Sequence, residues 1–142
     1  KARNSIDLFL EKYPNSDYAT DLKFKRNLVE NQLAAKELFV ARYYIDVKKW
    51  VPAIKRLKII TEKYNTTIFV EEALHRLVEI YFHLGLEDEA RSYAAILGYN
   101  YNSSEWFKKS YKVFNKNYED FQKKIKKEKK EKLLGRILKI IK

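Results

Sequence analysis

One short pattern occurs three times in this chain and limits the folds that the chain can adopt. Residues 13–19 (YPNSDYA), 64–70 (YNTTIFV) and 101–106 (YNSSEW) each begin with Tyr before Pro or Asn, followed by Ser or Thr and then an aromatic side chain. Pro or Asn is typical of a helix end, and Ser or Thr of the cap that starts the next helix. The copies begin 51 and 37 residues apart. Recurrence at such spacing indicates stacked helical hairpins, which use their surfaces to bind other molecules.

The composition supports a helical and globular chain. The sequence has 142 residues, of which 46% are hydrophobic, and this is enough to bury a core. It contains only 3 Gly and 2 Pro, too few turn residues for a many-stranded sheet. No Cys is present, so disulfides, thiol nucleophiles and Cys-ligated metals are excluded. No apolar run reaches the roughly 18–20 residues that span a bilayer.

The chain begins with Lys1 and contains no Met. We therefore expect it to be a processed or truncated piece whose leader or anchor lies outside the sequence.

Apolar residues recur at helical spacing between the three turns. The second helix is expected to be long, because residues 18–46 contain neither Gly nor Pro, and its length accounts for the wider spacing of the first two copies. The expected helices cover residues 3–13, 18–46, 50–64, 70–84 and 87–97, with one more from Ser103 or Ser104 to Phe114. The expected end signals are Pro14, the break at 47–49, Gly85 and Gly98, and the expected N-caps are Ser16 or Asp17 and Ser103 or Ser104.

Two segments match the tetratricopeptide repeat. Ala73, Leu77, Tyr81, Gly85 and Ala90 follow its order of small, large, aromatic, turn and small residues. Small side chains allow the two helices of a hairpin to approach closely, while large ones fill the space beside them. Residues 50–65 fit the second helix of another repeat. Within 70–84 the expected inward side chains are Ala73, Leu74, Leu77, Val78, Tyr81 and Leu84. The predicted fold class is an all-α helical-hairpin solenoid.

The net charge of +11 is unevenly distributed. Residues 108–142 carry 14 Lys or Arg and 4 Asp or Glu, whereas residues 1–107 carry 16 and 15. We therefore divide the chain into a repeat array, 1–114, and a basic helical or partly disordered tail, 115–142. The tail has three interpretations, which are a solvated extension docked on the array, attraction to an anionic membrane surface, and non-specific nucleic-acid binding.

Several stretches resemble the BamD (ComL) family, the tetratricopeptide lipoproteins of the outer-membrane β-barrel assembly machinery. The resemblance covers about residues 2–107. It departs at Lys48 and Lys49, where a Gly-containing turn is usual, and in the tail, for which the family offers no counterpart. The matching stretches are FLEKYPNS (9–16), YAxD (18–21), RNLxxxQLA (26–34), ELFVARYY (37–44), WVPA (50–53) with Arg56, EAL (72–74) and the LGL turn (84–86).

This resemblance implies a non-enzymatic scaffold at the periplasmic face of the outer membrane, with its lipid anchor and first repeats outside this sequence. The C-terminal repeats of the family hold the membrane-proximal periplasmic (POTRA) domain of the barrel subunit BamA. Arg56 matches the family's arginine on the second helix of its repeat, so Arg56, Lys55, Trp50 and Lys49 are the candidate partner-binding residues. An Arg is well suited to pairing with a carboxylate. The alternative is a generic tetratricopeptide adaptor, cytoplasmic or RNA-associated, that works through the basic tail.

The sequence gives little support for other functions. His75 and His83 are 8 residues apart and lack neighbours that would complete a metal site. We find no Gly-x-Ser-x-Gly motif, no glycine-rich phosphate loop and no plausible Ser–His pair. The acidic groups at 71–72 and 87–89 fit favourable positions at helix N-termini. The sequence therefore gives no sign of an enzyme activity, a cofactor or a small-molecule substrate. The periplasmic location that the resemblance implies also leaves no nucleic-acid partner expected.

Overall fold

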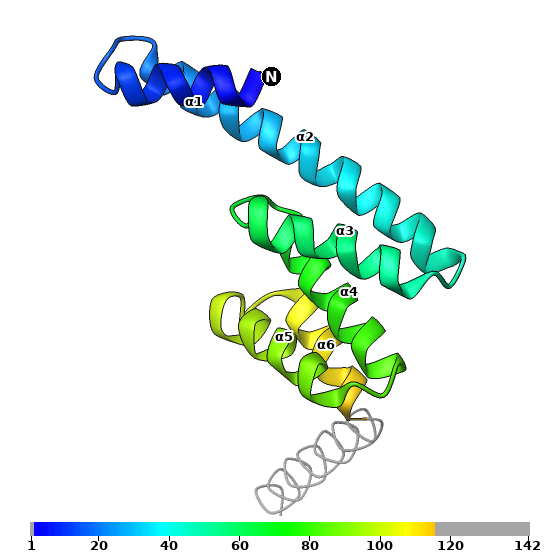
Figure 1. Cartoon of the computed structure of the whole chain (residues 1–142). Coiled ribbons are helices and arrows are strands. Elements are labelled where there is room, and N and C mark those ends of the chain that lie inside the picture. The colour runs from blue at the N-terminus through cyan, green and yellow to red at the C-terminus, as the bar shows by residue number, and fades with distance from the viewer. Residues whose placement is uncertain (1, 116–142) are drawn as a thin grey trace, which may run out of the picture.

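The computed structural model describes residues 2–115, and every regular element in that range is an α-helix. Consecutive helices form antiparallel hairpins that stack along one direction, as in a tetratricopeptide array (Figure 1). None of the described helices is both long and apolar enough to cross a membrane. The helices are α1 (Ala2–Lys12), α2 (Ala19–Asp46), α3 (Trp50–Lys63), α4 (Val70–His83), α5 (Glu87–Asn100) and α6 (Glu105–Phe114). The predicted tail falls almost entirely on residues 116–142, which lie outside the described part.

The three copies of the repeated pattern form the same kind of turn. In each copy the Tyr amide donates to a carbonyl of the helix that ends there, and the amide of the following Ser or Thr donates to the Tyr carbonyl. The Ser or Thr bonds are Ser16 N to Tyr13 O (3.3 Å), Thr67 N to Tyr64 O (3.1 Å) and Ser104 N to Tyr101 O (3.0 Å). The helix stop that the Tyr-containing pattern predicts is therefore confirmed at each of the three turns.

The length of α2 explains the unequal spacing of the copies. This helix has 28 residues, whereas α4 has 14. The difference of 14 residues equals the difference between the spacings of 51 and 37 in the sequence. At 1.5 Å per residue, α2 is about 42 Å long. It packs against α1 along one part of its length and against α3 along another (Figure 1).

A contiguous core joins α2, α3, α4 and α5. Ala residues with no exposed surface occur on all four helices, where they permit close approach. Leu57, Ile60 and Leu77 fill the spaces between them and are also fully buried. The buried alanines are Ala34, Ala41, Ala53, Ala73 and Ala90. This alternation of small and large side chains is the packing that the repeat pattern predicted.

The helix starts agree with the predicted caps at one place and disagree at another. Ser104 caps α6, because its hydroxyl accepts a hydrogen bond from the Phe107 amide at 3.0 Å. The prediction that Ser16 or Asp17 caps α2 is wrong. Tyr18 is the N-cap residue and makes no side-chain cap bond. An additional turn, in which the Ala19 amide donates to the Ser16 carbonyl, separates Ser16 from the start of the helix.

Two further details of the core differ from the prediction. Gly98 does not end α5, which continues to Asn100. A Cβ atom at Gly98 would lie 2.8 Å from Cε2 of Phe107, so the glycine permits the close approach of α6. Leu84 does not face inward, since it is 41% exposed in the turn after α4. Both positions mark turn or contact geometry that helical spacing alone does not encode.

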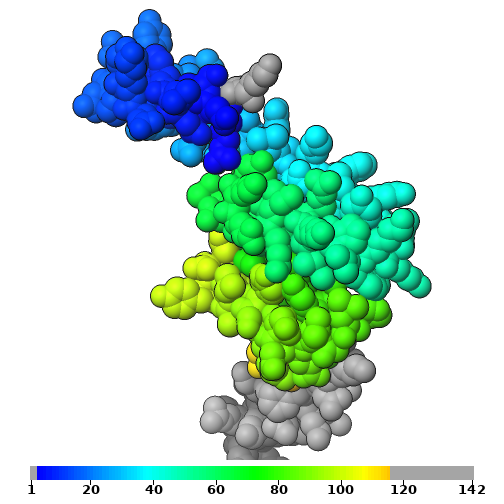
Figure 2. Space-filling model, viewed as in Figure 1, coloured from blue at the N-terminus to red at the C-terminus, as the bar shows by residue number. Residues whose placement is uncertain are grey.

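A small polar network connects the α1–α2 hairpin to the rest of the array. The Glu30 carboxylate is 7% exposed and pairs with Arg3 of α1, with Arg3 Nε 3.1 Å from Glu30 Oε1. The Thr66 hydroxyl donates to the other Glu30 oxygen at 3.5 Å, and the Ile68 amide donates to the Asn31 side chain at 3.3 Å. The turn between α3 and α4 is therefore attached to the middle of α2 (Figure 2 shows α1 projecting beyond this region).

The turns after α2 and α4 have the same geometry but different residues. Both end in a left-handed residue, Lys48 with φ 57° and Gly85 with φ 76°. Both close by two hydrogen bonds, Lys48 N to Ile45 O and Lys49 N to Tyr44 O in the first, and Gly85 N to Phe82 O and Leu86 N to Tyr81 O in the second. This is the Schellman arrangement, in which glycine is the favoured left-handed residue.

A Lys48→Gly variant is expected to raise the free energy of unfolding by about 1 kcal/mol, because a side chain in the left-handed region costs roughly that amount. Urea unfolding followed by circular dichroism measures the change. Gly85→Ala is the matched control and is expected to lose about the same amount, because a Cβ there meets no atom within 4 Å and only the backbone conformation is tested. A loss of stability in Lys48→Gly would contradict this account of the turn.

Candidate partner-binding surface

A groove between α2 and α3 contains two of the four predicted partner-binding residues. Lys55 and Arg56 lie beside each other along it, and the remaining lining is mostly apolar. The groove has a volume of about 420 Å³. Tyr44 from α2 and Val51, Pro52 and Ile59 from α3 complete its lining. A mostly apolar lining that carries two cations suits a partner that presents apolar and carboxylate groups together.

The arginine is held in place by a carboxylate of the neighbouring helix. Arg56 Nη1 donates to Glu37 Oε2 at 3.0 Å, which links α3 to α2. The Arg56 side chain is 42% exposed, whereas that of Glu37 is 17% exposed. Because a guanidinium has five N–H donors, Arg56 can keep this bond and still present donors to a partner.

The other two predicted residues lie apart from the groove. Trp50 is half-buried against the main core, and its ring lies 4.9 Å from the ring of His83 on α4. Lys49 is exposed in the turn before α3, and its amide bonds to the carbonyl of Tyr44. The structure thus brings Lys55 and Arg56 together, places Lys49 at the α2–α3 turn, and gives Trp50 a packing role.

Sequence reasoning missed the apolar half of this groove. Val51 is 63% exposed, and it occurs with Lys55 and Ile59 at intervals of four residues, a spacing that places the three on one face of α3. That face differs from the buried stripe of Ala53, Leu57 and Ile60. The signal in the sequence was therefore a second face of this helix that carries two apolar side chains, Val51 and Ile59.

A buried carboxylate connects α2 to α4. Glu72 is 7% exposed, and Arg42 donates to both of its oxygens, from Nε at 3.0 Å and from Nη2 at 2.5 Å. Arg76 approaches the same carboxylate, with Nε 3.5 Å from Oε1. The sequence explained Glu72 only by its place in the first turn of a helix. Its principal contact is this ion pair with a residue 30 positions earlier.

A buried Ser–His pair attaches α6 to α4, a contact that the sequence analysis, which looked only for a catalytic pair, did not predict. His75 Nδ1 lies 2.8 Å from the Ser110 hydroxyl, and His75 Nε2 lies 3.3 Å from the Glu79 carboxylate. Burial raises the pKa of Glu79, but interactions with His75 and Arg76 outweigh it and hold the pKa below its ordinary value. Ser110 has no exposed surface and therefore cannot meet a substrate, so the pair joins the two helices.

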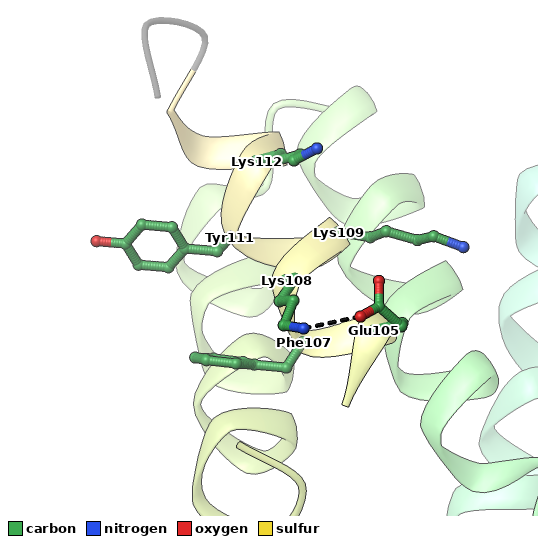
Figure 3. Close-up of a pocket in the computed structure, with 6 residues that line it drawn as sticks. All are labelled: Glu105, Phe107, Lys108, Lys109, Tyr111 and Lys112. Carbon is green, nitrogen blue, oxygen red and sulfur yellow. Dashed lines mark hydrogen bonds and ion pairs between the residues drawn. The ribbon is translucent and has the colours of Figure 1, made fainter. Parts of the chain in front are cut away.

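The exposed side of α6 forms a second surface, which is basic and aromatic. Lys108, Lys109 and Lys112 line it together with Phe107, Tyr111 and Glu105 (Figure 3). Lys108 Nζ pairs with Glu105 Oε1 at 2.7 Å, and this hydrogen bond lowers the pKa of the Glu105 carboxyl. Lys109 Nζ lies 4.2 Å from the centre of the Trp106 ring.

The two histidines do not assemble a metal site. His75 is buried in the pair with Ser110, and His83 is exposed beside Trp50. Within residues 2–115, no group of three or more His, Asp or Glu side chains could hold a metal ion.

A model of the YfiO family, described as an outer membrane lipoprotein, matches residues 1–97. The chain belongs to this family. The YfiO match includes α1 to α4 and most of α5, and so contains the α2–α3 groove with Lys55 and Arg56. Helix α6 and its basic surface lie beyond the matched residues.

Individual proteins of the same kind are also similar to the chain. It is 41% identical over 119 residues to the outer membrane protein assembly factor BamD of Rickettsia prowazekii. These aligned residues make up 84% of this chain and 47% of that protein. It is 41% identical over 108 residues to BamD of Caulobacter vibrioides, covering 76% and 35% of the two chains. BamD of Xylella fastidiosa is 34% identical over 108 residues. The chain spans less than half the length of each of these relatives.

Proposed function

We propose that this chain is a non-enzymatic scaffold segment of an outer-membrane β-barrel assembly complex, at the periplasmic face of the outer membrane. The support comes from membership of the YfiO lipoprotein family and from relatives named as outer membrane protein assembly factors. Stacked helical repeats that expose extended surfaces suit such a role.

We further propose that the α2–α3 groove docks the periplasmic POTRA region of the barrel subunit BamA. The observation that carries this proposal is the pairing of Lys55 and Arg56 beside the exposed apolar side chain of Val51. Arg and Tyr are enriched among the residues that dominate the binding energy of protein interfaces, and Arg56 and Tyr44 both line this groove. Because Glu37 already orients Arg56, little side-chain freedom is lost when a partner binds.

The test is a titration of this chain against the isolated membrane-proximal POTRA domain from the same organism, without lipid. Arg56→Glu is expected to weaken binding by about tenfold or more, roughly 1.4 kcal/mol. Lys55→Glu is expected to act in the same direction while leaving the Arg56–Glu37 ion pair intact. Lys63→Glu, at the far end of the same helix, is the control and is expected to leave the affinity unchanged.

A charge exchange separates docking from folding. The double variant Arg56→Glu with Glu37→Arg restores an ion pair between α2 and α3 but reverses its direction. If the groove docks the partner through Arg56, binding stays weak in the double variant. Full recovery of binding would mean that Arg56 acts only through packing of the two helices, and would remove the groove as the docking site.

A further inference from the structure

The outer face of α2 carries apolar side chains that no other described helix covers. Phe39 is 74% exposed and Tyr43 is 58% exposed, whereas Leu38, next to Phe39, is buried in the core. Val47 follows at the next interval of four residues and is 43% exposed, so the three side chains lie along one face. We call Phe39, Tyr43 and Val47 the outer stripe. The docking role proposed above uses the groove between α2 and α3 and leaves this stripe without a function.

The outer stripe is continuous with the groove. Tyr44 lines the groove, and its ring lies 5.7 Å from the ring of Tyr43. Val40 is partly exposed. With about 3.6 residues per turn, Val40 lies about 40° around α2 from Tyr44, and Tyr43 lies about 60° further. Phe39 lies about 40° beyond Tyr43, so one apolar surface runs from the groove around α2 to its outer face.

The groove is too small to hold a stable partner alone. Six described residues line it, whereas a specific interface buries about 800 Å² and roughly 20–30 residues on each partner. A partner seated in the groove must therefore cover neighbouring surface as well. Beyond Ile59 the exposed residues of α3 are Glu62 and Lys63, which are charged. The outer stripe is thus the apolar route by which the contact can extend.

We propose that the partner docked in the groove also covers the outer stripe, with an apolar side chain of its own packed against Phe39 and Tyr43. This inference rests on the docking function proposed above and names a second contact of the same partner, the POTRA domain. Aromatic side chains are enriched in protein interfaces. Because Phe and Tyr have only two rotatable side-chain torsions, they supply a large contact area at a small entropic cost.

The charge around the outer stripe fits a partner that brings carboxylates to the groove. Lys36 lies one turn before the stripe, and Lys48 and Lys49 directly follow it. All three lysines are exposed, and none of them has an ion pair within residues 2–115. Asp46 is the one acidic residue between positions 38 and 50. These lysines favour a partner whose apolar contact is bordered by acidic side chains, as the cations of the groove also do.

The test is a titration of this chain against the isolated membrane-proximal POTRA domain, with Phe39→Ala and Tyr43→Ala combined in one variant. This variant is expected to weaken binding by about tenfold. Tyr is enriched among the residues that dominate interface energies, and the variant removes the Phe39 ring as well.

Phe24→Ala with Leu28→Ala is the matched control. These two side chains also lie four residues apart on α2 and are exposed, at 62% and 49%. Phe24 lies about 22 Å nearer the N-terminal end of the helix than Phe39 does. The control variant is expected to bind as the unchanged chain does.

Lys36→Glu tests the contribution of charge. It is expected to slow association severalfold at low salt and by less at high salt, because a charge at the rim of an interface acts mainly on the rate of encounter. Lys23→Glu is its control, since Lys23 is also exposed on α2 and has no ion pair within the described residues. Equal effects of the two variants would assign the change to net charge and would overturn the argument from the position of Lys36.

Hydroxyl-radical footprinting gives a readout that needs no variant. Phe39 and Tyr43 are expected to react severalfold more slowly when the POTRA domain is bound, whereas Phe24 is expected to react at the same rate. Circular dichroism and urea unfolding verify that the alanine variants remain folded.

Three outcomes would overturn the inference. No binding by the unchanged chain would overturn it together with the docking function. Binding that Arg56→Glu weakens, without an effect of the Phe39–Tyr43 variant and without protection of the two rings, would overturn this inference alone and leave docking in the groove. Equal weakening by the Phe24–Leu28 control would show that the effect does not belong to the outer stripe.

Discussion

A Leu57→Ala variant is expected to lose about 3 kcal/mol of unfolding free energy, within the roughly 2–5 kcal/mol range of fully buried leucines. Leu57 has no exposed surface and lies in the core cluster to which α2, α3, α4 and α5 all contribute. Ala removes apolar contacts and leaves a cavity that three or more packed helices cannot easily close. Urea unfolding followed by circular dichroism measures the loss, with the midpoint and slope fitted separately.

Val51→Ala on the same helix is the control for Leu57→Ala. Val51 is 63% exposed, so this variant is expected to change the free energy of unfolding by less than about 0.5 kcal/mol. Equal losses in the two variants would contradict the assignment of the Leu57 effect to burial, because Ala is the better helix former at both positions. A lower slope in Leu57→Ala alone would indicate that this variant no longer unfolds in a single cooperative step.

The second large effect concerns the ion pair between α2 and α4. Arg42→Ala is expected to destabilise the chain by about 2 kcal/mol, because it leaves the buried Glu72 carboxylate with only the longer contact to Arg76. Glu72→Ala is expected to lower the free energy of unfolding by less than Arg42→Ala does, since the Arg42 side chain is 53% exposed and can be solvated without its partner. Thermal and urea unfolding of the two single variants test this order.

A double variant completes the comparison. Replacing Arg42 and Glu72 together by Leu is expected to recover most of the loss, because no buried charge then remains without a partner. Arg76→Gln is the companion control, and it is expected to cost less than Arg42→Ala because its contact with Glu72 is longer, at 3.5 Å. A larger cost for Glu72→Ala than for Arg42→Ala would contradict the argument from burial.

Features that depend on residues close together in the sequence were predictable. The repeated Tyr-containing turns, the doubled length of α2 and the buried stripe of α3 follow from local spacing and turn residues. The small-to-large alternation that packs α4 against its neighbours also follows, because it is encoded at fixed intervals along one helix.

Features that depend on contacts between helices were not predictable. Gly98 resembles a helix end in the sequence, yet its role is to admit Phe107 from the next helix. His75 and Ser110 are 35 residues apart and meet only because α6 returns across α4. Ser16 has the chemistry of a cap, but the additional turn before α2 places it too early. In each case the deciding partner is distant in the chain.

The candidate site was predictable only in part for the same reason. Arg56 was identified by resemblance, and Lys55 by its position next to it. The Glu37 contact and the exposed Val51 required the geometry of α2 against α3. Trp50 was named as a partner-binding residue because it lies near Arg56, whereas its ring packs against the core and lies 4.9 Å from the ring of His83 on α4.

The length of α2 has a mechanical consequence. One end of this helix is clamped by α3 and the core, and the other carries α1, which projects past the rest of the array (Figure 1). In a helix about 42 Å long, a rotation of about 10° at the clamped end would move the free end by about 7 Å. The contacts of Glu30 with Thr66 and of Asn31 with Ile68 shorten the free part of this lever. Force applied at α1 would therefore reach the α3–α4 turn through these two side chains before it reached the core.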